Sequence, residues 1–467
     1  MILRILNKDV PLHNILLVIG EGVLIYASVV LAAFLRFGNL QSSLFSTDLL
    51  SKGLVIMVVS QASLYFNELY NLQVTDTYLE LGLRLTKAIG IASIALAVIY
   101  YVLPALLVGR GIFFISLLFV VILIVSWRYV YNWTLKKKIF TERILLLGSG
   151  ELSQKILNEV NGQRDSGYEV AGVVSANHNK SQEFPEEIPV FSMYNLELPL
   201  CEFSQSNHIK KIIVTMTDKR GKLPLKELLR CKMRGMTILN GESFYEKVTG
   251  KILAENIQPS WFIYGEGFRK SRLVRFSKRT VDLILATLGL ALSLPLTLFI
   301  AAAIKFDSKG PIIYKQERTG QDGRNFDLCK FRSMIEDAEA ECGPVWTEDD
   351  DCRITRVGRV LRKFRLDETP QMWNVLKGDM SFIGPRPERP EFVKELEKIV
   401  PYYSERHTAK PGISGWAQVS YGYGASAEDA LEKLKYDLFY IKNMSILLDF
   451  RIILKTIKIV LQQRGAR

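Results

Sequence analysis

Three clusters of charged residues near the C-terminal end of the chain have residue types and spacing suited to phosphate chemistry. They cover residues 316–334, 351–371 and 378–387, and each combines arginines with glycine or proline. A guanidinium group matches phosphate oxygens with two parallel hydrogen bonds. The clusters therefore predict a site for an anionic, phosphate-bearing ligand.

One pair of adjacent acids, Asp367 and Glu368, lies among these cations. The arginines that closely precede the pair are Arg359, Arg362 and Arg365. Carboxylates surrounded by cations stay ionised and can hold Mg²⁺, which prefers a few carboxylates together with substrate phosphates. An isolated acid pair is more often the solvated face of a helix, and this alternative stays open. Beside a membrane element, the pattern favours diphosphate chemistry at a membrane surface.

Such an element lies directly before the clusters: a long apolar run from Leu283 to Ile304, with Pro295 at its middle. Basic residues flank the run on both sides, whereas a spanning helix collects them mainly on its cytoplasmic side. Proline also breaks the helical hydrogen-bond ladder, because it lacks an N–H group and clashes with the preceding turn. We expect a helix over about residues 280–305 that enters the bilayer, bends near Ser293 and Pro295, and returns to the same side. A plain spanning helix with a proline kink is the alternative.

Four further apolar stretches lie in the first 135 residues. They cover residues 14–35, 53–69, 88–107 and 112–133. Each is close to the ~20 residues that cross ~30 Å of hydrocarbon. No small-residue cleavage site follows the first stretch, so we expect a retained span and no removable signal peptide. Glu21 lies inside this stretch, either as a functional intramembrane acid or as a contact between helices.

The orientation of these stretches follows from their flanking charges, because short cytoplasmic loops collect Lys and Arg. The basic residues at the end of the fourth stretch and after it are Arg128, Lys136, Lys137, Lys138 and Arg143. We therefore expect the rest of the chain on the cytoplasmic side. Four crossings would place the N-terminus on the same side.

Residues 139–260 alternate strand and helix patterns, which indicates a small parallel α/β domain. The expected strands cover residues 143–150, 168–175, 209–216 and 236–239, and the expected helices cover residues 151–160 and 223–234. The turn Gly148-Ser149-Gly150 resembles the start of a dinucleotide fingerprint. Ser153 occupies the third glycine position, however, and no acid ends the second strand. Nucleotide binding and a structural or regulatory Rossmann-like role both stay open.

The composition agrees with a membrane protein of several domains. The chain has 467 residues, of which 48% are hydrophobic, and its formal net charge is +12. This charge fits an anionic leaflet and a phosphate ligand. Nucleic-acid binding is not expected, because the sequence has no module of interleaved basic and aromatic residues. The five cysteines form no CxxC pair, so neither a zinc site nor a disulfide framework is expected.

These patterns together predict the organisation of the chain. We expect a membrane α-helical N-terminal bundle of four spans over residues 1–138, a Rossmann-like α/β domain over 139–260, a linker over 261–275, and a mixed α/β, mostly helical domain over 276–467. The tail, residues 446–461, mixes apolar and charged residues. It could lie as an amphipathic helix in the membrane interface, or pack on the C-terminal domain.

Several motifs of the C-terminal part occur in the order found in one family. They are Lys278-Arg279 with Asp282, Lys330-Phe-Arg-Ser-Met334, Leu366-Asp-Glu-Thr-Pro-Gln371, Trp373-Asn-Val-Leu-Lys-Gly-Asp-Met380, Gly384-Pro-Arg-Pro387 and Pro411-Gly-Ile-Ser-Gly-Trp-Ala-Gln-Val419. From about Lys278 to its end the chain resembles the bacterial sugar transferases that load polyprenyl phosphate, in the long form of the monotopic phosphoglycosyl transferases. Its N-terminal half resembles the long members more loosely. Residues 421–426 with Tyr436-Asp437 resemble the exopolysaccharide subgroup, whereas Leu294-Pro295 departs from the Ser-Pro pair of many relatives.

The resemblance implies a reaction, a cofactor and partners. Asp367 would be the nucleophile that attacks the sugar-bearing phosphorus of a UDP-sugar and expels UMP, and undecaprenyl phosphate would then take up the phosphosugar. Asp367 and Glu368 would hold Mg²⁺. The catalytic domain would work on the cytoplasmic face of a bacterial inner membrane, with the lipid bilayer as a partner. A homodimer is implied only by the family.

The resemblance also implies roles for further residues. Substrate phosphates would be bound by Lys330, Arg332, Arg362 and Arg386. The re-entrant helix would be anchored by Arg279, Asp282, Ser293 and Pro295, and the first two could pair because they are three residues apart on a helix. Two other classes stay open: a membrane-bound NAD-dependent nucleotide-sugar oxidoreductase and a non-catalytic polysaccharide-assembly scaffold. No residue pattern identifies the transferred sugar.

Overall fold

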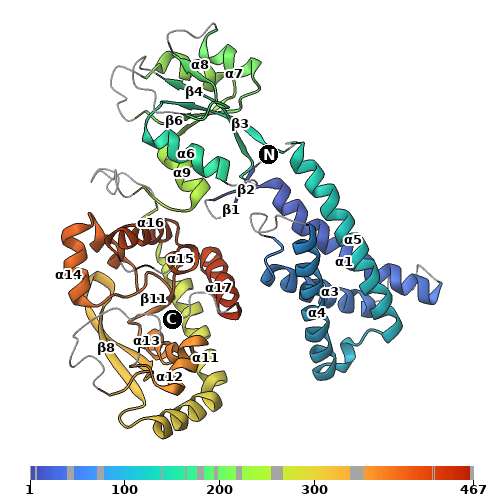
Figure 1. Ribbon diagram of the computed structural model, residues 1–467, viewed down its shortest axis with the longest axis vertical. Coiled ribbons are helices and arrows are strands. Elements are labelled where there is room, and N and C mark those ends of the chain that lie inside the picture. Colours follow the sequence, from blue (N-terminus) through green and yellow to red (C-terminus); the bar gives the residue numbers. More distant parts are fainter. Residues whose placement is uncertain are drawn as a thin grey trace. The chain divides into compact units, whose positions relative to one another are not determined.

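The computed structural model describes residues 2–5, 8–38, 47–70, 78–137, 140–162, 166–175, 184–193, 198–216, 223–253, 267–336, 351, 353–422, 424 and 426–462 (Figure 1). The chain divides into two compact units, Met1–Phe244 and Tyr245–Arg467. In the described part, five helices are long and apolar enough to cross a membrane. The fifth, Arg272–Asp307, belongs to the second unit.

The first unit begins with a hairpin and a set of long helices. The hairpin pairs β1 (Ile2–Ile5) with β2 (Lys8–Pro11), and the helices are α1 (Leu12–Phe37), α3 (Thr47–Phe66), α4 (Tyr78–Val102), η1 (Pro104–Leu106) and α5 (Arg110–Lys136). α1 packs on α3 and α5, and α3 packs on α4. The four predicted apolar stretches thus fall on helices. α4 begins before the predicted apolar stretch. Its first turns contain the charged residues Glu80, Arg84 and Lys87, which a search for apolar runs leaves out.

A buried ion pair joins α1 to α5. The Arg128 guanidinium lies 2.8 Å from the Glu21 carboxylate, and both side chains are buried. Arg128 also donates a hydrogen bond of 2.9 Å to the carbonyl of Leu69. The expectation that Arg128 belongs to a basic cytoplasmic flank is therefore wrong, because its charge is used inside the helix bundle. For Glu21 the contact between helices is the interpretation that the structure supports.

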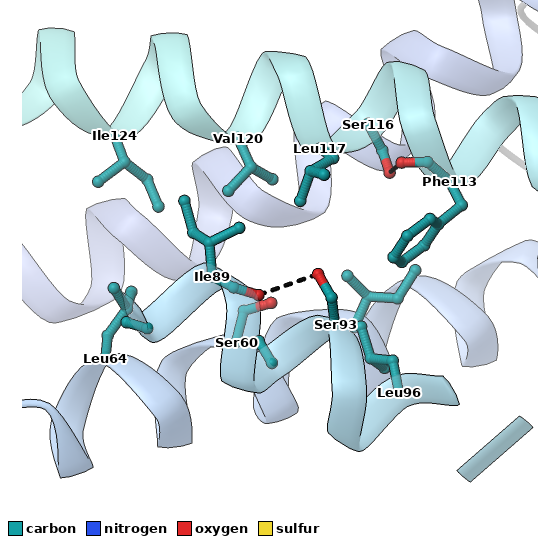
Figure 2. Close-up of a pocket in the computed structure, with 13 residues that line it drawn as sticks. Ser60, Leu64, Ile89, Ser93, Leu96, Phe113, Ser116, Leu117, Val120 and Ile124 are labelled. Carbon is teal, nitrogen blue, oxygen red and sulfur yellow. Dashed lines mark hydrogen bonds between the residues drawn. The ribbon is translucent and has the colours of Figure 1, made fainter. Parts of the chain in front are cut away.

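A small cavity lies between α3, α4 and α5 (Figure 2). Its lining is mostly apolar, with Ser93 and Ser116 among the polar exceptions. Both hydroxyls donate to carbonyls of their own helices, Ser93 to Ile89 at 2.9 Å and Ser116 to Phe113 at 2.8 Å. These hydroxyl donors are therefore satisfied within their helices and are not available to a ligand in the cavity.

The rest of the first unit is a parallel five-stranded sheet in the order β5-β4-β3-β6-β7. Its elements are β3 (Glu142–Leu147), α6 (Glu151–Gly162), β4 (Tyr168–Ser175), β5 (Val190–Ser192), α7 (Leu200–Ser206), β6 (Lys211–Val214), α8 (Leu225–Met233) and β7 (Thr237–Asn240), followed by α9 (Gly241–Thr249). The predicted parallel α/β sheet is confirmed. Its central strand β3 has neighbours on both sides, which is the Rossmann-like arrangement, and Leu145, Leu146 and Leu147 on it are fully buried.

The glycine turn after β3 packs against the side chains of Ser153 and Thr215. Gly148 has φ 129°, and a Cβ there would lie 2.7 Å from the Thr215 hydroxyl oxygen, so glycine is required. The buried Ser153 hydroxyl donates to the Gly148 carbonyl at 2.6 Å and lies 2.6 Å from the Thr215 hydroxyl. Ser153, at the third glycine position, thus links α6 to the end of β6, which agrees with a structural role for this turn. Of the end of the second predicted strand, Ala176 and Asn177 lie outside the described residues.

The second unit is mostly helical, with two small sheets. After α11 (Arg272–Asp307) come β8 (Ile313–Thr319), η3 (Gln321–Gly323), β9 (Asn325–Phe331), α12 (Arg356–Lys363), η4 (Leu366–Glu368), α13 (Gln371–Lys377), β10 (Ser381–Ile383), α14 (Pro390–Ile399), η5 (Tyr403–Thr408), β11 (Gly412–Ser414), α15 (Trp416–Ser420), α16 (Ala427–Asn443) and α17 (Ile446–Leu461). β8 and β9 pair antiparallel, and β10 and β11 pair parallel. The largest core of this unit is built on α16 and α17, around Leu438, Phe439 and Ile452.

The predicted re-entrant segment lies within α11, a single 36-residue helix with Pro295 inside it. The helix begins at Arg272, so it includes the end of the predicted linker. Its first half packs through Ala286 on α13, and its second half packs through Ile300 and Ile304 on β9 and α12. Figure 1 shows the helix changing direction along its length. Around the proline its apolar side chains, among them Leu292, are exposed.

The C-terminal helix α17 has two apolar faces. Leu448 and Ile452 are buried in the core with α16, so packing on the domain is confirmed for one face. On the other face apolar side chains are exposed, namely Leu447, Phe450, Ile457 and Leu461. A position in the membrane interface stays a prediction for this second face. The described cysteines Cys201, Cys231 and Cys329 are free, and Cys342 and Cys352 lie outside the described residues.

Glu21→Ala should destabilise the helical part of the first unit, because it leaves the Arg128 guanidinium buried without its counter-charge. Breaking a buried ion pair lowers the free energy of unfolding by about 3–5 kcal/mol. Thermal unfolding in detergent measures the effect, with Arg110→Ala, an exposed position at the start of α5, as the control. An unchanged midpoint for Glu21→Ala would show that the pair does not hold α1 against α5.

Candidate active site

The acid pair lies on one short turn, η4, between α12 and α13. Arg365, directly before the turn, has the left-handed conformation with φ 54° and ψ 26°. Such a conformation costs a non-glycine residue on the order of 1–3 kcal/mol, and residues held in it cluster at active sites and ligand clamps. The reversal at Arg365 brings Asp367 and Glu368 back beside strand β9, which contacts η4.

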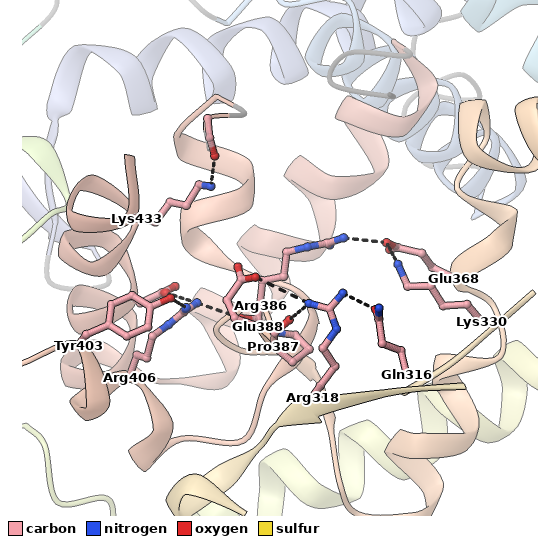
Figure 3. A network of polar contacts seen from close by, with 12 residues as sticks. Gln316, Arg318, Lys330, Glu368, Arg386, Pro387, Glu388, Tyr403, Arg406 and Lys433 are labelled. Atoms are coloured by element: carbon pink, nitrogen blue, oxygen red, sulfur yellow. Dashed lines mark hydrogen bonds and ion pairs between the residues drawn. The ribbon is translucent and has the colours of Figure 1, made fainter. Parts of the chain in front are cut away.

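Glu368 is held by two cations from different elements (Figure 3). Its Oε1 lies 3.3 Å from Lys330 Nζ, on β9, and 3.2 Å from Arg386 Nη2, which follows β10. Burial alone would raise the pKa of Glu368, but the charges of Lys330, Arg386 and Arg365 lower that pKa to about 2. Glu368 is therefore ionised at neutral pH. Conversely, burial lowers the pKa of Lys330, and the Glu368 charge opposes this shift.

Asp367 has a different environment, although it is the next residue. Its side chain is buried, and within the described part of the chain it makes no hydrogen bond or ion pair. Burial raises the pKa of Asp367, Lys330 opposes this shift, and the Glu368 charge adds to it. A carboxylate that no donor stabilises is a stronger nucleophile and metal ligand than one held by two cations. The turn thus combines one anchored acid with one available acid.

The other two predicted phosphate-binding arginines differ in position. Arg362 donates from Nε to the Ser333 hydroxyl at 2.9 Å, and its charge lowers the pKa of Asp367, so it lies at the site. Arg332 instead donates from Nη2 to the carbonyl and hydroxyl of Ser308, at 2.8 and 2.9 Å. Within the described residues Arg332 contacts neither acid. The structure brings together three of the four predicted cations.

Arg279 and Asp282 of α11 do not pair with each other, so that expectation is wrong. Arg279 donates to the carbonyls of Val375 and Leu376, at 2.6 and 2.9 Å. Asp282 accepts from the Ser381 hydroxyl and the Phe382 amide, both at 3.0 Å. Arg279 binds these carbonyls and not Asp282, because the last carbonyls of a helix have no partner within their own helix and attract cations. Both residues still anchor α11, Arg279 to α13, the helix that follows the acid pair, and Asp282 to β10.

Two residues without a predicted role complete this framework. Lys278 lies 2.8 Å from the Asp449 carboxylate on α17 and donates to the Ile383 carbonyl at 2.9 Å. The fully buried Asn374 accepts from the Cys329 amide at 3.0 Å and donates to the Asp327 carbonyl at 2.7 Å. Asn374 thereby fixes α13 against the strand that carries Lys330. Both residues belong to motifs of the sequence, but their roles follow only from partners that lie far away along the chain.

The two remaining predicted anchors are local features of α11. The Ser293 hydroxyl donates to the Leu290 carbonyl at 3.3 Å, one turn earlier. Pro295 lies inside the helix without ending it.

Asp367 and Glu368 fit a Mg²⁺ ion that binds together with a substrate, but they do not form a protein-only cage. Among the described residues no group of three or more His, Cys, Asp or Glu side chains could hold a metal. Mg²⁺ typically uses one or two carboxylates plus substrate phosphates. The available carboxylate of Asp367 meets that requirement, and Glu368 already balances two cations.

Arg279→Ala should destabilise the second unit, because it removes the side-chain donor of the Leu376 carbonyl and one of the two donors of the Val375 carbonyl, the other being the Gly378 amide. Unsatisfied buried groups cost about 1–3 kcal/mol of the free energy of unfolding. The midpoint of thermal unfolding in detergent measures the loss. Arg275→Ala removes an exposed arginine of the same helix and is the matched control. Equal midpoints for the two variants would contradict the anchoring role.

Comparison with known proteins follows the same division of the chain. Residues 273–463 match the family model described as bacterial sugar transferase, and residues 66–222 match one described as CoA-binding domain. The chain is 42% identical over 240 residues to a UDP-N-acetylgalactosamine-undecaprenyl-phosphate N-acetylgalactosaminephosphotransferase of Aeromonas hydrophila, a match that covers 51% of this chain and 56% of the relative. It is 42% identical over 192 residues to a UDP-glucose:undecaprenyl-phosphate glucose-1-phosphate transferase of Xanthomonas campestris pv. campestris, covering 41% and 40%.

These two matches span about half the length of the relatives concerned. A longer match joins the chain to a UDP-galactose-lipid carrier transferase of Erwinia amylovora. It is 30% identical over 348 residues and covers 71% of this chain and 70% of the relative. The acid pair, its cations and all of α11 after Arg272 lie inside the region matched by the first family model. The chain therefore belongs to the bacterial sugar transferase family.

Proposed function

We propose that this chain transfers a sugar 1-phosphate from a UDP-sugar to polyprenyl (undecaprenyl) phosphate, and releases UMP. One observation carries the proposal: Asp367 is buried and takes no donor from the residues that the structure describes, beside Glu368, which two cations hold. The names of the relatives, which include undecaprenyl-phosphate sugar phosphotransferases, supply the substrate classes. The identity of the sugar is open.

The reaction proceeds in two displacements at one phosphorus atom. In the first, an Asp367 carboxylate oxygen bonds to the sugar-bearing phosphorus, and the bond from that phosphorus to the bridging oxygen breaks. UMP leaves with the electron pair of that bond. In the second, an oxygen of polyprenyl phosphate attacks the same phosphorus and restores the Asp367 carboxylate. Covalent catalysis of this kind divides one difficult displacement into two easier ones.

The cations around the turn stabilise the charge on the transferring phosphate. Lys330 and Arg386 already face Glu368, and Arg362 lies close enough to influence Asp367. Fixed cations need no reorganisation as the leaving phosphate develops its charge. Asp367 and Glu368 would hold Mg²⁺ with the diphosphate, and the ion would neutralise charge on the phosphate oxygens.

We further propose that α11 dips into one leaflet and returns. A straight helix of this length would measure about 54 Å, well beyond the ~30 Å hydrocarbon core. Both halves of α11 nevertheless pack on the second unit, through Ala286 before Pro295 and through Ile300 and Ile304 after it. These contacts support a bend, because a helix that crossed the bilayer would separate them. The exposed face of α17 would lie in the same interface.

The proposed arrangement has the second unit on the cytoplasmic face of a bacterial inner membrane, where it meets UDP-sugars. The four long helices of the first unit would be spans, and Lys136, Lys137 and Lys138 would mark their cytoplasmic end. The lipid bilayer is then a partner as well as the source of polyprenyl phosphate. A homodimer stays a prediction.

Asp367→Asn should abolish UMP release, because an amide is a poor nucleophile and carries no charge for Mg²⁺. The assay offers a panel of UDP-sugars with polyprenyl phosphate and Mg²⁺ to the full chain in detergent. A loss of about a thousandfold or more is expected, typical of removing a covalent nucleophile. Asp322→Asn, an exposed acid of the same unit, is the control. Full activity of Asp367→Asn would exclude the mechanism.

A further inference from the structure

The segment that carries Arg386 has an unusual backbone. Gly384-Pro385-Arg386-Pro387-Glu388 forms no helix and, beyond β10, no strand. Pro385 and Pro387 have no amide hydrogen, so this segment depends on donors that come to its carbonyls. Such donors are present at every step from Pro385 to Glu388.

These four successive carbonyls accept hydrogen bonds from four different residues. The donors are the Gly412 amide to Pro385 at 2.9 Å, Arg406 Nη2 to Arg386 at 2.9 Å, Arg318 Nη1 to Pro387 at 3.1 Å, and the Thr319 amide to Glu388 at 2.9 Å. Two of the donors are arginine side chains. Figure 3 shows Arg318 and Arg406 reaching the segment from different elements.

Arg406 is itself fixed by a buried partner. Its side chain is 4% exposed, and its Nη2 lies 2.9 Å from the Asp437 carboxylate of α16, which is 2% exposed. Its Nη1 donates to the Tyr403 hydroxyl. The same nitrogen, Nη2, thus bridges Asp437 and the Arg386 carbonyl. This links α16 through the backbone of Arg386 to the guanidinium that holds Glu368.

We propose that Arg406 and Asp437, assisted by Arg318, are positioning residues that hold the Arg386 backbone so that its guanidinium faces Glu368 and the substrate phosphate. They act through Arg386 and touch no substrate themselves. This inference rests on the proposed function. A displacement of about 1 Å in such a group costs roughly a hundredfold in rate, so the expected effect is on kcat.

The test must separate positioning from simple stabilisation of the fold. A buried ion pair can often be replaced by apolar residues without loss of stability. The double variant Arg406→Met with Asp437→Val therefore removes the bridge while leaving no unpaired charge. Lys442→Met is the matched control on α16, because it removes an ion pair of 2.7 Å with Glu246 and leaves the Arg406–Asp437 pair in place.

The readouts are thermal unfolding, and kcat and KM for UMP release from the best UDP-sugar of the panel. The double variant should unfold near the wild-type temperature, lose roughly ten- to hundredfold in kcat, and keep its KM within about threefold. Lys442→Met should keep both constants. A folded double variant with wild-type kcat would overturn the positioning role, whereas an inactive wild type would instead overturn the proposed function.

A second variant decides the matter if the double variant does not fold. Arg406→Lys keeps a positive charge beside Asp437, but its side chain is shorter and offers one nitrogen in place of the planar fork. We expect it to fold and to show reduced kcat. Amide exchange at Gly412 and Thr319, which donate to the same segment, should also accelerate locally in this variant. Wild-type kcat and wild-type exchange together would contradict the proposal.

Discussion

The site depends on keeping two adjacent carboxylates in one buried turn. Two neighbouring negative charges repel each other, and burial disfavours the charged form of each. Lys330 and Arg386 pair directly with Glu368, so that acid is anchored and ionised. Asp367 keeps its oxygens for other partners. Because the two neighbouring acids differ in their contacts, one of them is fixed in place and the other can react.

The framework of the second unit serves this turn. Asn374 fixes the strand of Lys330 against α13, and Arg279 fixes α11 to the carbonyls of the next two residues of α13, Val375 and Leu376. The position of the membrane-type helix is therefore linked to the position of the acids by a chain of short contacts. An enzyme with one soluble and one lipid substrate needs such a link, because the reacting groups must meet at one depth.

Much of this arrangement could be predicted from the sequence, because it depends on local patterns. Apolar runs indicated the long helices, alternating patterns indicated the parallel sheet, and the clustered charges indicated a phosphate site around the acid pair. The family resemblance then named Lys330 and Arg386 as its cations. Local reasoning failed where distant partners decide. Arg332 stands two residues after Lys330, but it follows the end of β9 and binds Ser308 at the end of α11. Arg279 and Asp282 are within reach of each other, yet backbone groups about a hundred residues away bind them. Arg406 gave no local signal, and Asp437 stood out only in the Tyr436-Asp437 pair that resembles the exopolysaccharide subgroup.

A trapping experiment tests the central claim most directly. The full chain is mixed with Mg²⁺ and a UDP-sugar labelled in its sugar-bearing phosphate, in the absence of polyprenyl phosphate, then denatured and digested. The account predicts label on the peptide that contains Asp367, its release by hydroxylamine as for an acyl phosphate, and its loss in Asp367→Asn. Turnover by the wild type without any labelled protein, or label that persists in Asp367→Asn, would contradict it.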